Sequence, residues 1–261
     1  MREEAPLAGI VTATGTAVNK LGFSVGDYIG GGSIIHPKVV LTGAHKLDGK
    51  EPTEVKCRAG EYDTQTELEA YPFQERNAQK FIFHEDFFRP SVINNIALII
   101  LEQPFDISSS TPNIGIACVG TSIPMPGTNC ETMGWGLEDF NNIDKYAVKL
   151  KKVVIKLTSR SKCQNALRGT RLGSRFQLHQ SLMCAGGEKN RDACTGDGGS
   201  PLVCPIGNDE DRYAVVGTVA WGIGCGDEGV PGVYSIVPDF KPWIDKQMKE
   251  EGLKITYEYA D

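Results

Sequence analysis

The stretch CTGDGGSPLVC, residues 194–204, sets three glycines and one aspartate between two cysteines, and then enters an apolar run. Glycines permit the backbone conformations of a tight turn, and a short apolar run beside such a turn is typical of a strand. Similar short runs, punctuated by Gly and Pro, recur along the whole chain, at residues 34–45, 80–87, 96–105, 151–157, 212–221 and 232–237. This spacing predicts an all-β chain whose strands form a barrel or a sandwich.

The composition indicates a soluble globular protein. The chain has 261 residues, of which 40% are hydrophobic and 30 are glycine, with a net charge of -6 and a pI near 5.4. An acidic chain lacks the broad basic surface that neutralises phosphates, so we expect no nucleic-acid partner, although Lys149, Lys151 and Lys152 form a local basic patch. No apolar run approaches the roughly 20 residues that span a bilayer, and we expect no membrane span.

The eight cysteines indicate disulfides rather than a zinc site, because no CxxC pair or Cys/His cluster occurs. Disulfides predict an extracellular, secreted protein. Residues 1–4 (MREE) contain neither an apolar signal segment nor a pro-segment. We therefore expect that upstream sequence is missing from this chain.

Helical patterning is scarce. Residues 161–168 favour a short helix, and residues 238–251 favour an amphipathic C-terminal helix with Phe240, Trp243, Ile244 and Met248 on one face. Residues 252–261 are expected to form a polar, frayed tail.

Six motifs, taken in order, resemble the trypsin/chymotrypsin-like serine proteases. They are VVLTGAH (39–45), NNIALIIL (94–101), MGWG (133–136), CTGDGGSPLVC (194–204), VAWGIGCG (219–226) and PGVYSIV (231–237). The resemblance implies a single trypsin-like domain over residues 1–261, with two six-stranded antiparallel β-barrels and a C-terminal helix. The first barrel would cover about residues 4–118, and the second about 119–237.

Three further segments narrow the resemblance to the arthropod serine protease homologues of the clip-domain group. They are CRAGEYDTQTE (57–67), CAGGEKNRDACTGDGGSPLVC (184–204) and VAWGIGCG. In that group a glycine replaces the nucleophile. EAPLAGIV (4–11) looks like a drifted form of the group's strand EFPWMVAI, so the clip domain would be absent from this chain.

The resemblance assigns a degenerate catalytic triad. His45 matches the base, Asn95 takes the place of the aspartate and Gly198 stands at the nucleophile position. An amide there favours the wrong histidine tautomer and lowers the rate on the order of 10⁴-fold, while loss of the nucleophile removes the covalent route. The alternative is that Ser200 acts instead, but it lies just before Pro201 and should not face His45.

The resemblance also implies remnants of two subsites. Asp192 matches the base of a specificity pocket for Arg or Lys, and Gly222 and Gly232 match its small wall positions. This pocket is either open to a substrate side chain or collapsed as a relic. Gly196, Asp197 and Gly198 match the oxyanion turn. Active relatives pair this aspartate with a new N-terminal amine, which the chain lacks, so we expect a zymogen-like turn whose donor to Asp197 the sequence does not name.

Family positions imply three disulfides, namely Cys130–Cys204, Cys163–Cys184 and Cys194–Cys225. The bridge beside the catalytic histidine is lost at both ends, which correspond to Gly30 and Lys46. Cys57 and Cys118 remain unassigned. Cys118 matches a position that tethers an upstream module, and it is either free or paired with Cys57.

No metal site or cofactor is expected. Acidic side chains gather where trypsin-like proteins bind calcium, at Glu61, Asp63, Glu67, Glu69 and Glu75. Carboxylate oxygens are the ligands that calcium prefers, but acidic runs of this kind are more commonly solvated surface loops. We therefore expect a surface loop, with calcium binding as the alternative.

The sequence therefore favours a catalytically inactive serine protease homologue that acts by binding proteins. The group resemblance implies partners such as proteases or prophenoloxidase, in an extracellular innate-immune cascade that leads to melanisation. Two alternatives remain, an active trypsin-like endopeptidase that uses Ser200 and an adhesion or microbe-recognition module. Cleavage of an arginine ester would distinguish the first alternative, and the partners that the chain captures would distinguish the second.

Overall fold

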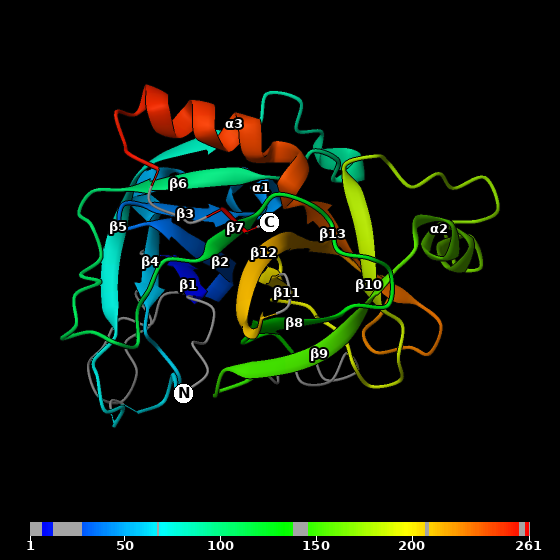
Figure 1. The fold of residues 1–261 in the computed structure, drawn as a ribbon, viewed down its shortest axis with the longest axis horizontal. Helices are drawn as coiled ribbons and strands as arrows, with labels where there is room; N and C mark the ends of the chain where they lie inside the picture. Colours follow the sequence, from blue (N-terminus) through cyan, green and yellow to red (C-terminus); the bar gives the residue numbers. More distant parts are fainter. Residues whose placement is uncertain are drawn as a thin grey trace.

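A computed structural model describes residues 7–12, 28–66, 68–137, 146–206, 209–255 and 259–260. The chain folds into two β-barrels with one long helix packed across them and one short helix at the far side of the second barrel (Figure 1). No helix among these residues has the length and apolar character needed to cross a membrane.

The first barrel is closed and fully antiparallel. Its strands follow the order β1, β2, β3, β6, β5, β4 around the barrel. Their bounds are β1 (Leu7–Thr12), β2 (Tyr28–His36), β3 (Val39–Thr42), β4 (Val55–Ala59), β5 (Gln74–Phe83) and β6 (Ala97–Leu101). β3 and β6 are buried at every residue, which explains their uninterrupted apolar sequences, whereas β4 alternates because one face is partly exposed.

The second barrel is a ring of six strands. Their bounds are β8 (Asn129–Gly134), β9 (Lys151–Thr158), β10 (Leu182–Gly186), β11 (Pro201–Ile206), β12 (Asp209–Trp221) and β13 (Pro231–Ile236). The order is β11, β8, β9, β10, β13, β12, and a further pairing of β11 with β12 closes the ring. The two six-stranded barrels predicted from the resemblance are confirmed.

Two short strands extend this sheet beyond the ring. β7 (Cys118–Gly120) pairs in parallel with β12, and β14 (Tyr259–Ala260) pairs in parallel with β7. The end of the tail is therefore paired with the sheet at these two residues, and the expectation of a frayed tail is wrong there.

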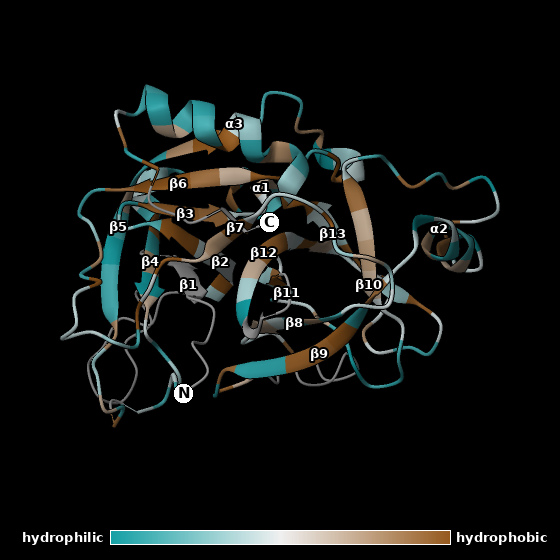
Figure 2. Cartoon of the chain, viewed as in Figure 1, coloured by the Kyte–Doolittle hydropathy of each residue, from teal (hydrophilic) through white to brown (hydrophobic). Residues whose placement is uncertain are grey.

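The helices agree closely with the sequence patterns. α2 spans Arg160–Arg168, and α3 spans Val237–Glu250 with the four expected apolar residues buried, while its outer turns are hydrophilic (Figure 2). The single turn α1 (Ala44–Leu47) and two 3-10 turns, η1 (Pro52–Glu54) and η2 (Arg89–Ser91), lie in loops of the first barrel.

One core cluster joins the two barrels and α3. Leu41 and Leu98 of the first barrel share it with Val203 and Val215 of the second and with Trp243 of α3. Burial of large apolar side chains contributes roughly 1.5–3 kcal/mol each, so this cluster fixes the barrels relative to one another. The loops between the barrels are consequently held on a rigid frame.

Three disulfides stabilise the second half of the chain. They are Cys130–Cys204, Cys163–Cys184 and Cys194–Cys225, the pairs that the resemblance implied. Each contributes about 2–4 kcal/mol by restricting the unfolded chain. Cys57 lies in the core of the first barrel as a buried thiol outside any disulfide, so it is not bonded to Cys118, and burial raises its pKa to about 12.

Candidate functional site

His45 and Asn95 meet between the barrels. α1 carries His45 directly after β3, and Asn95 lies in the loop before β6. The backbone N–H of His45 donates to Asn95 Oδ1 at 2.9 Å, and the same oxygen lies 3.0 Å from His45 Nδ1. An amide oxygen only accepts, so Nδ1 carries the ring proton and Nε2 holds the lone pair.

This tautomer differs from the sequence expectation. The backbone N–H of His45 fixes which end of the Asn95 amide faces the ring, and the buried amide nitrogen has no hydrogen-bond partner among the described residues. Burial, with a smaller effect from Lys46, lowers the pKa of His45 to about 4. The imidazole is therefore neutral at pH 7, with Nε2 unprotonated.

Gly198 lies directly against that nitrogen. A Cβ atom added to Gly198 would be 2.6 Å from His45 Nε2 and 2.8 Å from Lys46 Cδ. The carbonyl of Gly198 accepts a hydrogen bond from Gly31 N at 3.0 Å, which ties the turn to β2. The structure thus brings together the three residues that the resemblance assigned to the triad, and a side chain at residue 198 would require His45 or Lys46 to shift.

Lys46 fills the space beside Gly30, where the resemblance placed the missing bridge. A Cβ atom on Gly30 would be 2.7 Å from Lys46 Cε and would collide with the carbonyl oxygen of Gly198. The lysine stem therefore lies between two glycines that carry no side chain. Burial and the nearby Lys50 lower the pKa of Lys46, and the Asp197 carboxylate raises it.

Ser200 points elsewhere. The residue has no exposed surface, and its Oγ occupies the space that a Cβ atom on Gly31 would need, 3.2 Å from the corresponding position on Gly134. No hydrogen bond joins this hydroxyl to His45, both of which lie in the described part of the chain. A hydroxyl in this position is poorly placed to attack a substrate in the cleft.

Backbone N–H groups donate hydrogen bonds to both oxygens of the Asp197 carboxyl group. Oδ1 accepts from Gly136 N, and Oδ2 accepts from Cys194 N, both at 2.8 Å. A Cβ atom on Gly134 or Gly136 would collide with this carboxyl group, so the glycines of the MGWG motif provide the space for it. Burial raises the pKa of Asp197 although both hydrogen bonds and Lys46 lower it.

Asp192 is bonded in a similar way. Its Oδ1 accepts from Ala193 N at 2.9 Å, and its Oδ2 accepts from Gly226 N at 3.2 Å. The small wall residue Gly232 allows this, because a Cβ atom on it would be 2.7 Å from Oδ1. Burial raises the pKa of Asp192 to about 7, against the effect of the two hydrogen bonds.

A cavity of about 300 Å³ adjoins both carboxyl groups. Its lining is Thr132, Met133, Gly134, Gly136, Leu137, Lys151, Lys152, Val153, Asp192, Ala193 and Asp197. It lies toward β8 and β9, and neither Gly222 nor Gly232 lines it. The cavity therefore reaches the Asp192 carboxyl group from the side of β8 and β9, and not from between the two glycines.

The acidic loop is organised around Arg58, which sequence reasoning missed. Arg58 forms salt bridges with Glu61 and Glu75, both at 2.9 Å. The spacing of three residues between Arg58 and Glu61 is a weak sequence signal for the first pair. Arg58 and Glu75 face each other across β4 and β5, and the 17 positions that separate them in sequence hide the second pair.

The other acidic residues of this loop do not form a metal site in the described part of the chain. Asp63 N donates to Glu69 Oε1 at 2.9 Å, so Glu69 caps the backbone of the loop. Glu67 lies outside the described residues. Among those that are described, no three His, Cys, Asp or Glu side chains gather to hold a metal ion.

Comparison with known proteins agrees with this geometry. The Trypsin family model matches residues 10–244. Phenoloxidase-activating factor 2 of Galleria mellonella is 47% identical over 231 residues, which is 88% of this chain and 75% of that protein. Inactive CLIP domain-containing serine protease A3 of Aedes aegypti is 43% identical over 220 residues, covering 83% of this chain.

A third relative is Inactive CLIP domain-containing serine protease A28 of Anopheles gambiae, which is 34% identical over 247 residues, or 93% of this chain. The chain spans 45% of the Aedes protein and 62% of the Anopheles protein. Two barrels, three disulfides and a family match over most of its length establish that the chain belongs to the trypsin family.

Proposed function

We propose that this chain is a catalytically inactive trypsin homologue that acts by binding other proteins. The observation that carries the proposal is that residue 198 is a glycine at the point where a Cβ atom would stand 2.6 Å from His45 Nε2. Acyl transfer in this family needs a hydroxyl at that point, activated by the histidine. Without it, His45 has no proton to accept from a nucleophile.

The nearby hydroxyl does not substitute for the missing one. Ser200 is fully buried against β2 and lacks a hydrogen bond to His45, so the alternative that it acts as a nucleophile has no geometric support. The neutral amide of Asn95 also provides no negative charge to stabilise an imidazolium. Both features favour a binding role over hydrolysis.

The cascade role rests on the relatives. One bears the name phenoloxidase-activating factor, and two are named inactive CLIP domain-containing serine proteases. We infer that this chain is a cofactor or regulator in an extracellular phenoloxidase cascade, and that its partners are a protease or prophenoloxidase. The disulfides agree with an oxidising, extracellular setting.

The first experiment tests the lack of catalysis. The purified chain is incubated with an arginine ester and, separately, with a fluorophosphonate probe that labels activated serines. We expect no turnover above buffer and no labelling. Labelling that peptide mapping traces to Ser200 would contradict the proposal, and trypsin at the same concentration is the positive control.

The second experiment tests the cascade role. Prophenoloxidase and its activating protease are mixed with or without the chain, and phenoloxidase activity is followed. We expect the chain to change the activity formed without cleaving prophenoloxidase itself. If activity is unchanged and capture experiments recover only microbial surface material, the chain is a recognition module instead.

A further inference from the structure

The charges of this chain are unevenly distributed. Acidic residues outnumber basic ones 33 to 27 overall, yet residues 146–187 contain no Asp or Glu. The same stretch carries nine basic residues, which are Lys149, Lys151, Lys152, Lys156, Arg160, Lys162, Arg168, Arg171 and Arg175. It covers β9, α2, the loop that follows α2, and β10.

In the β9 half, acidic residues from elsewhere in the chain compensate the lysines. The pairs are Lys149 with Asp63 at 3.8 Å, Lys152 with Glu131 at 3.1 Å and Lys156 with Glu188 at 3.5 Å. The basic patch suggested by the sequence at residues 149–152 is thus partly neutralised by neighbouring loops and strands.

The α2 half has no such compensation. Among the described residues, no carboxylate forms a salt bridge with Arg160, Lys162, Arg168, Arg171 or Arg175. Lys162, Arg171 and Arg175 are exposed to solvent. α2 and its loop project from the side of the second barrel (Figure 1), so these charges are accessible to another molecule.

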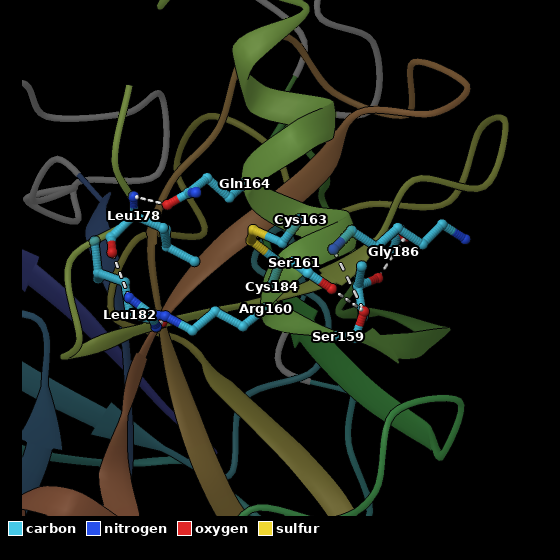
Figure 3. Close-up of a disulfide and its surroundings, with 11 residues drawn as sticks. Ser159, Arg160, Ser161, Cys163, Gln164, Leu178, Leu182, Cys184 and Gly186 are labelled. Atoms are coloured by element: carbon cyan, nitrogen blue, oxygen red, sulfur yellow. Dashed lines mark hydrogen bonds between the residues drawn. A yellow bond between two sulfur atoms is a disulfide. The ribbon is translucent and has the colours of Figure 1, made fainter. Parts of the chain in front are cut away.

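This projecting element is held rigidly. The disulfide Cys163–Cys184 ties α2 to β10, and Gln164 Oε1 accepts a hydrogen bond from Leu178 N at 3.0 Å (Figure 3). The loop after α2 is therefore fastened back onto the helix. A surface that is already ordered loses little entropy when it binds.

Two of the five basic side chains maintain this order. Arg160 donates to the carbonyl groups of Leu182, at 3.0 Å, and of Leu178, and Arg168 Nε donates to the carbonyl of Phe176 at 2.8 Å. Carbonyl groups are neutral, so these bonds position the loop and leave both positive charges uncompensated. The whole element consequently attracts anionic groups.

An apolar area adjoins the charges. The ring of Phe176, next to Arg175, packs edge-on against Trp221 with centroids 6.1 Å apart, and both side chains are half-buried. Leu172 belongs to the same cluster. The α2 surface is defined as the exposed Lys162 of α2 together with the exposed Arg171 and Arg175 and the half-buried Phe176 of the loop that follows.

We propose that the α2 surface docks an acidic segment of a partner protein. Carboxylates of that segment would pair with Lys162 and the two arginines, whose planar groups can hold a carboxylate through two hydrogen bonds, and its apolar side chains would rest on Phe176. The inference rests on the proposed function for the statement that the partner is a protein.

A polyanionic polymer or a lipid surface fits less well. Proteins that bind nucleic acid typically neutralise about 6–10 phosphates, and basic clusters that bind anionic lipids contain about 4–8 residues. The α2 element has four exposed cations, Arg160, Lys162, Arg171 and Arg175, and two carbonyl groups hold the Arg160 guanidinium in place. This number is below the range for phosphate contacts and at the low end of the range for lipid-binding clusters. The aromatic ring also suits a peptide better than a sugar sulfate or phosphate chain.

The test uses a labelled peptide in which Glu-Glu-Phe and Glu-Glu-Leu alternate, with a Gln-for-Glu peptide as its control. Binding is measured by fluorescence anisotropy for the intact chain and for the variant Lys162→Gln/Arg171→Gln/Arg175→Gln. None of these three side chains forms a hydrogen bond or ion pair with another described residue, so the fold should persist. The matched control, Lys246→Gln/Lys249→Gln/Lys254→Gln, removes the same charge from α3 and the segment after it.

We expect the acidic peptide to bind the intact chain and the α3 control equally, and the α2 variant at least about tenfold more weakly, since each exposed ion pair contributes modestly. The Gln peptide should bind none of them. Equal binding to the α2 variant would overturn the proposal. Tight binding of dextran sulfate or anionic vesicles without binding of the acidic peptide would also overturn it, in favour of a polyanion site.

This result is independent of the phenoloxidase assay. If the chain has no effect in the cascade but the peptide binds through the α2 surface, the proposed function fails and the docking surface remains. The opposite outcome is a chain that acts in the cascade and an α2 variant that acts equally well and binds the peptide with unchanged affinity. In that case the docking inference fails and the proposed function stands.

Discussion

His45 Nε2 lies 2.6 Å from the point where a Cβ atom on Gly198 would stand. This distance is shorter than any ordinary contact to a carbon atom, so a side chain at residue 198 would have to displace the imidazole. Lys46 Cδ, 2.8 Å from the same point, blocks the other side. The site would therefore have to rearrange around any side chain at residue 198.

Gly198→Ser, alone or with Asn95→Asp, should not produce an efficient protease. The new side chain overpacks the site, which typically costs about 1–3 kcal/mol, and it moves His45 away from the position needed for proton transfer. Turnover of an arginine ester, divided by an inhibitor-titrated count of active sites, should be several orders of magnitude below that of trypsin. Turnover near that of trypsin would show that the site accepts the serine without rearrangement.

Shortening Lys46 should restore part of the unfolding free energy that Gly198→Ser loses. In Gly198→Ser/Lys46→Ala the lysine stem no longer occupies the space, so the combined loss of unfolding free energy should be smaller than the sum of the single losses. Urea unfolding of the four proteins in this cycle measures the coupling. Strict additivity would mean that Lys46 does not restrict residue 198.

His45 should remain neutral well below neutral pH, with its proton on Nδ1. Its pKa of about 4 lies below that of an unfolded histidine, near 6.5, so the native state binds fewer protons and loses stability as the pH falls through this window. A ¹⁵N NMR titration should place the proton on Nδ1 at pH 7 and show protonation near pH 4. Asn95→Asp should raise the pKa, because a carboxylate favours the imidazolium.

Asp192 should make the protein less stable as the pH rises. Its pKa is about 7 in the folded chain and about 3.9 in the unfolded chain, so the native state holds a proton that the unfolded state releases between these values. The loss on going from pH 4 to pH 8 is on the order of 4 kcal/mol. Asp192→Asn should remove this part of the pH dependence.

The difference in unfolding free energy between wild type and Asp192→Asn, followed against pH, isolates Asp192 from His45. A difference that stays constant from pH 4 to pH 8 would mean that Asp192 titrates like an exposed carboxyl group and that its pocket is open to water.

Arg58→Gln should destabilise the acidic loop and make it sensitive to calcium. The Glu61 side chain is only 4% exposed, and removal of its partner leaves a buried carboxylate, which costs about 2–3 kcal/mol. The freed oxygens of Glu61 and Glu75 then suit calcium. We expect calcium to raise the melting temperature of the variant and to leave that of the wild type unchanged.

Lys56→Gln is the matched control, because Lys56 lies 3.8 Å from Glu75 and shares β4 with Arg58, while Glu61 pairs with Arg58. A wild-type protein that gains as much stability from calcium as Arg58→Gln would show that the loop binds the metal with Arg58 in place.

The sequence by itself determined the two barrels and the group of residues at the cleft. Residues 194–204 and the other motifs encode turns and strands within short segments, and the apolar runs of β3 and β6 indicate their own burial. The disulfide pairs followed from family positions, and the apolar face of α3 from its helical spacing. These features depend on neighbours along the chain or on a pattern shared with relatives.

Only the tertiary structure decided which atoms meet across the cleft. The face that the Asn95 amide turns toward His45, the backbone donors of Asp197 and the pairing of Arg58 with Glu75 depend on distances between segments far apart in sequence. The same holds for charge, because the lysines of β9 are compensated by acids from other elements while the basic residues of α2 have no such partner among the described residues. Hydrogen bonds and ion pairs act over a few ångströms, so their partners are fixed by the packed fold and not by the order of residues.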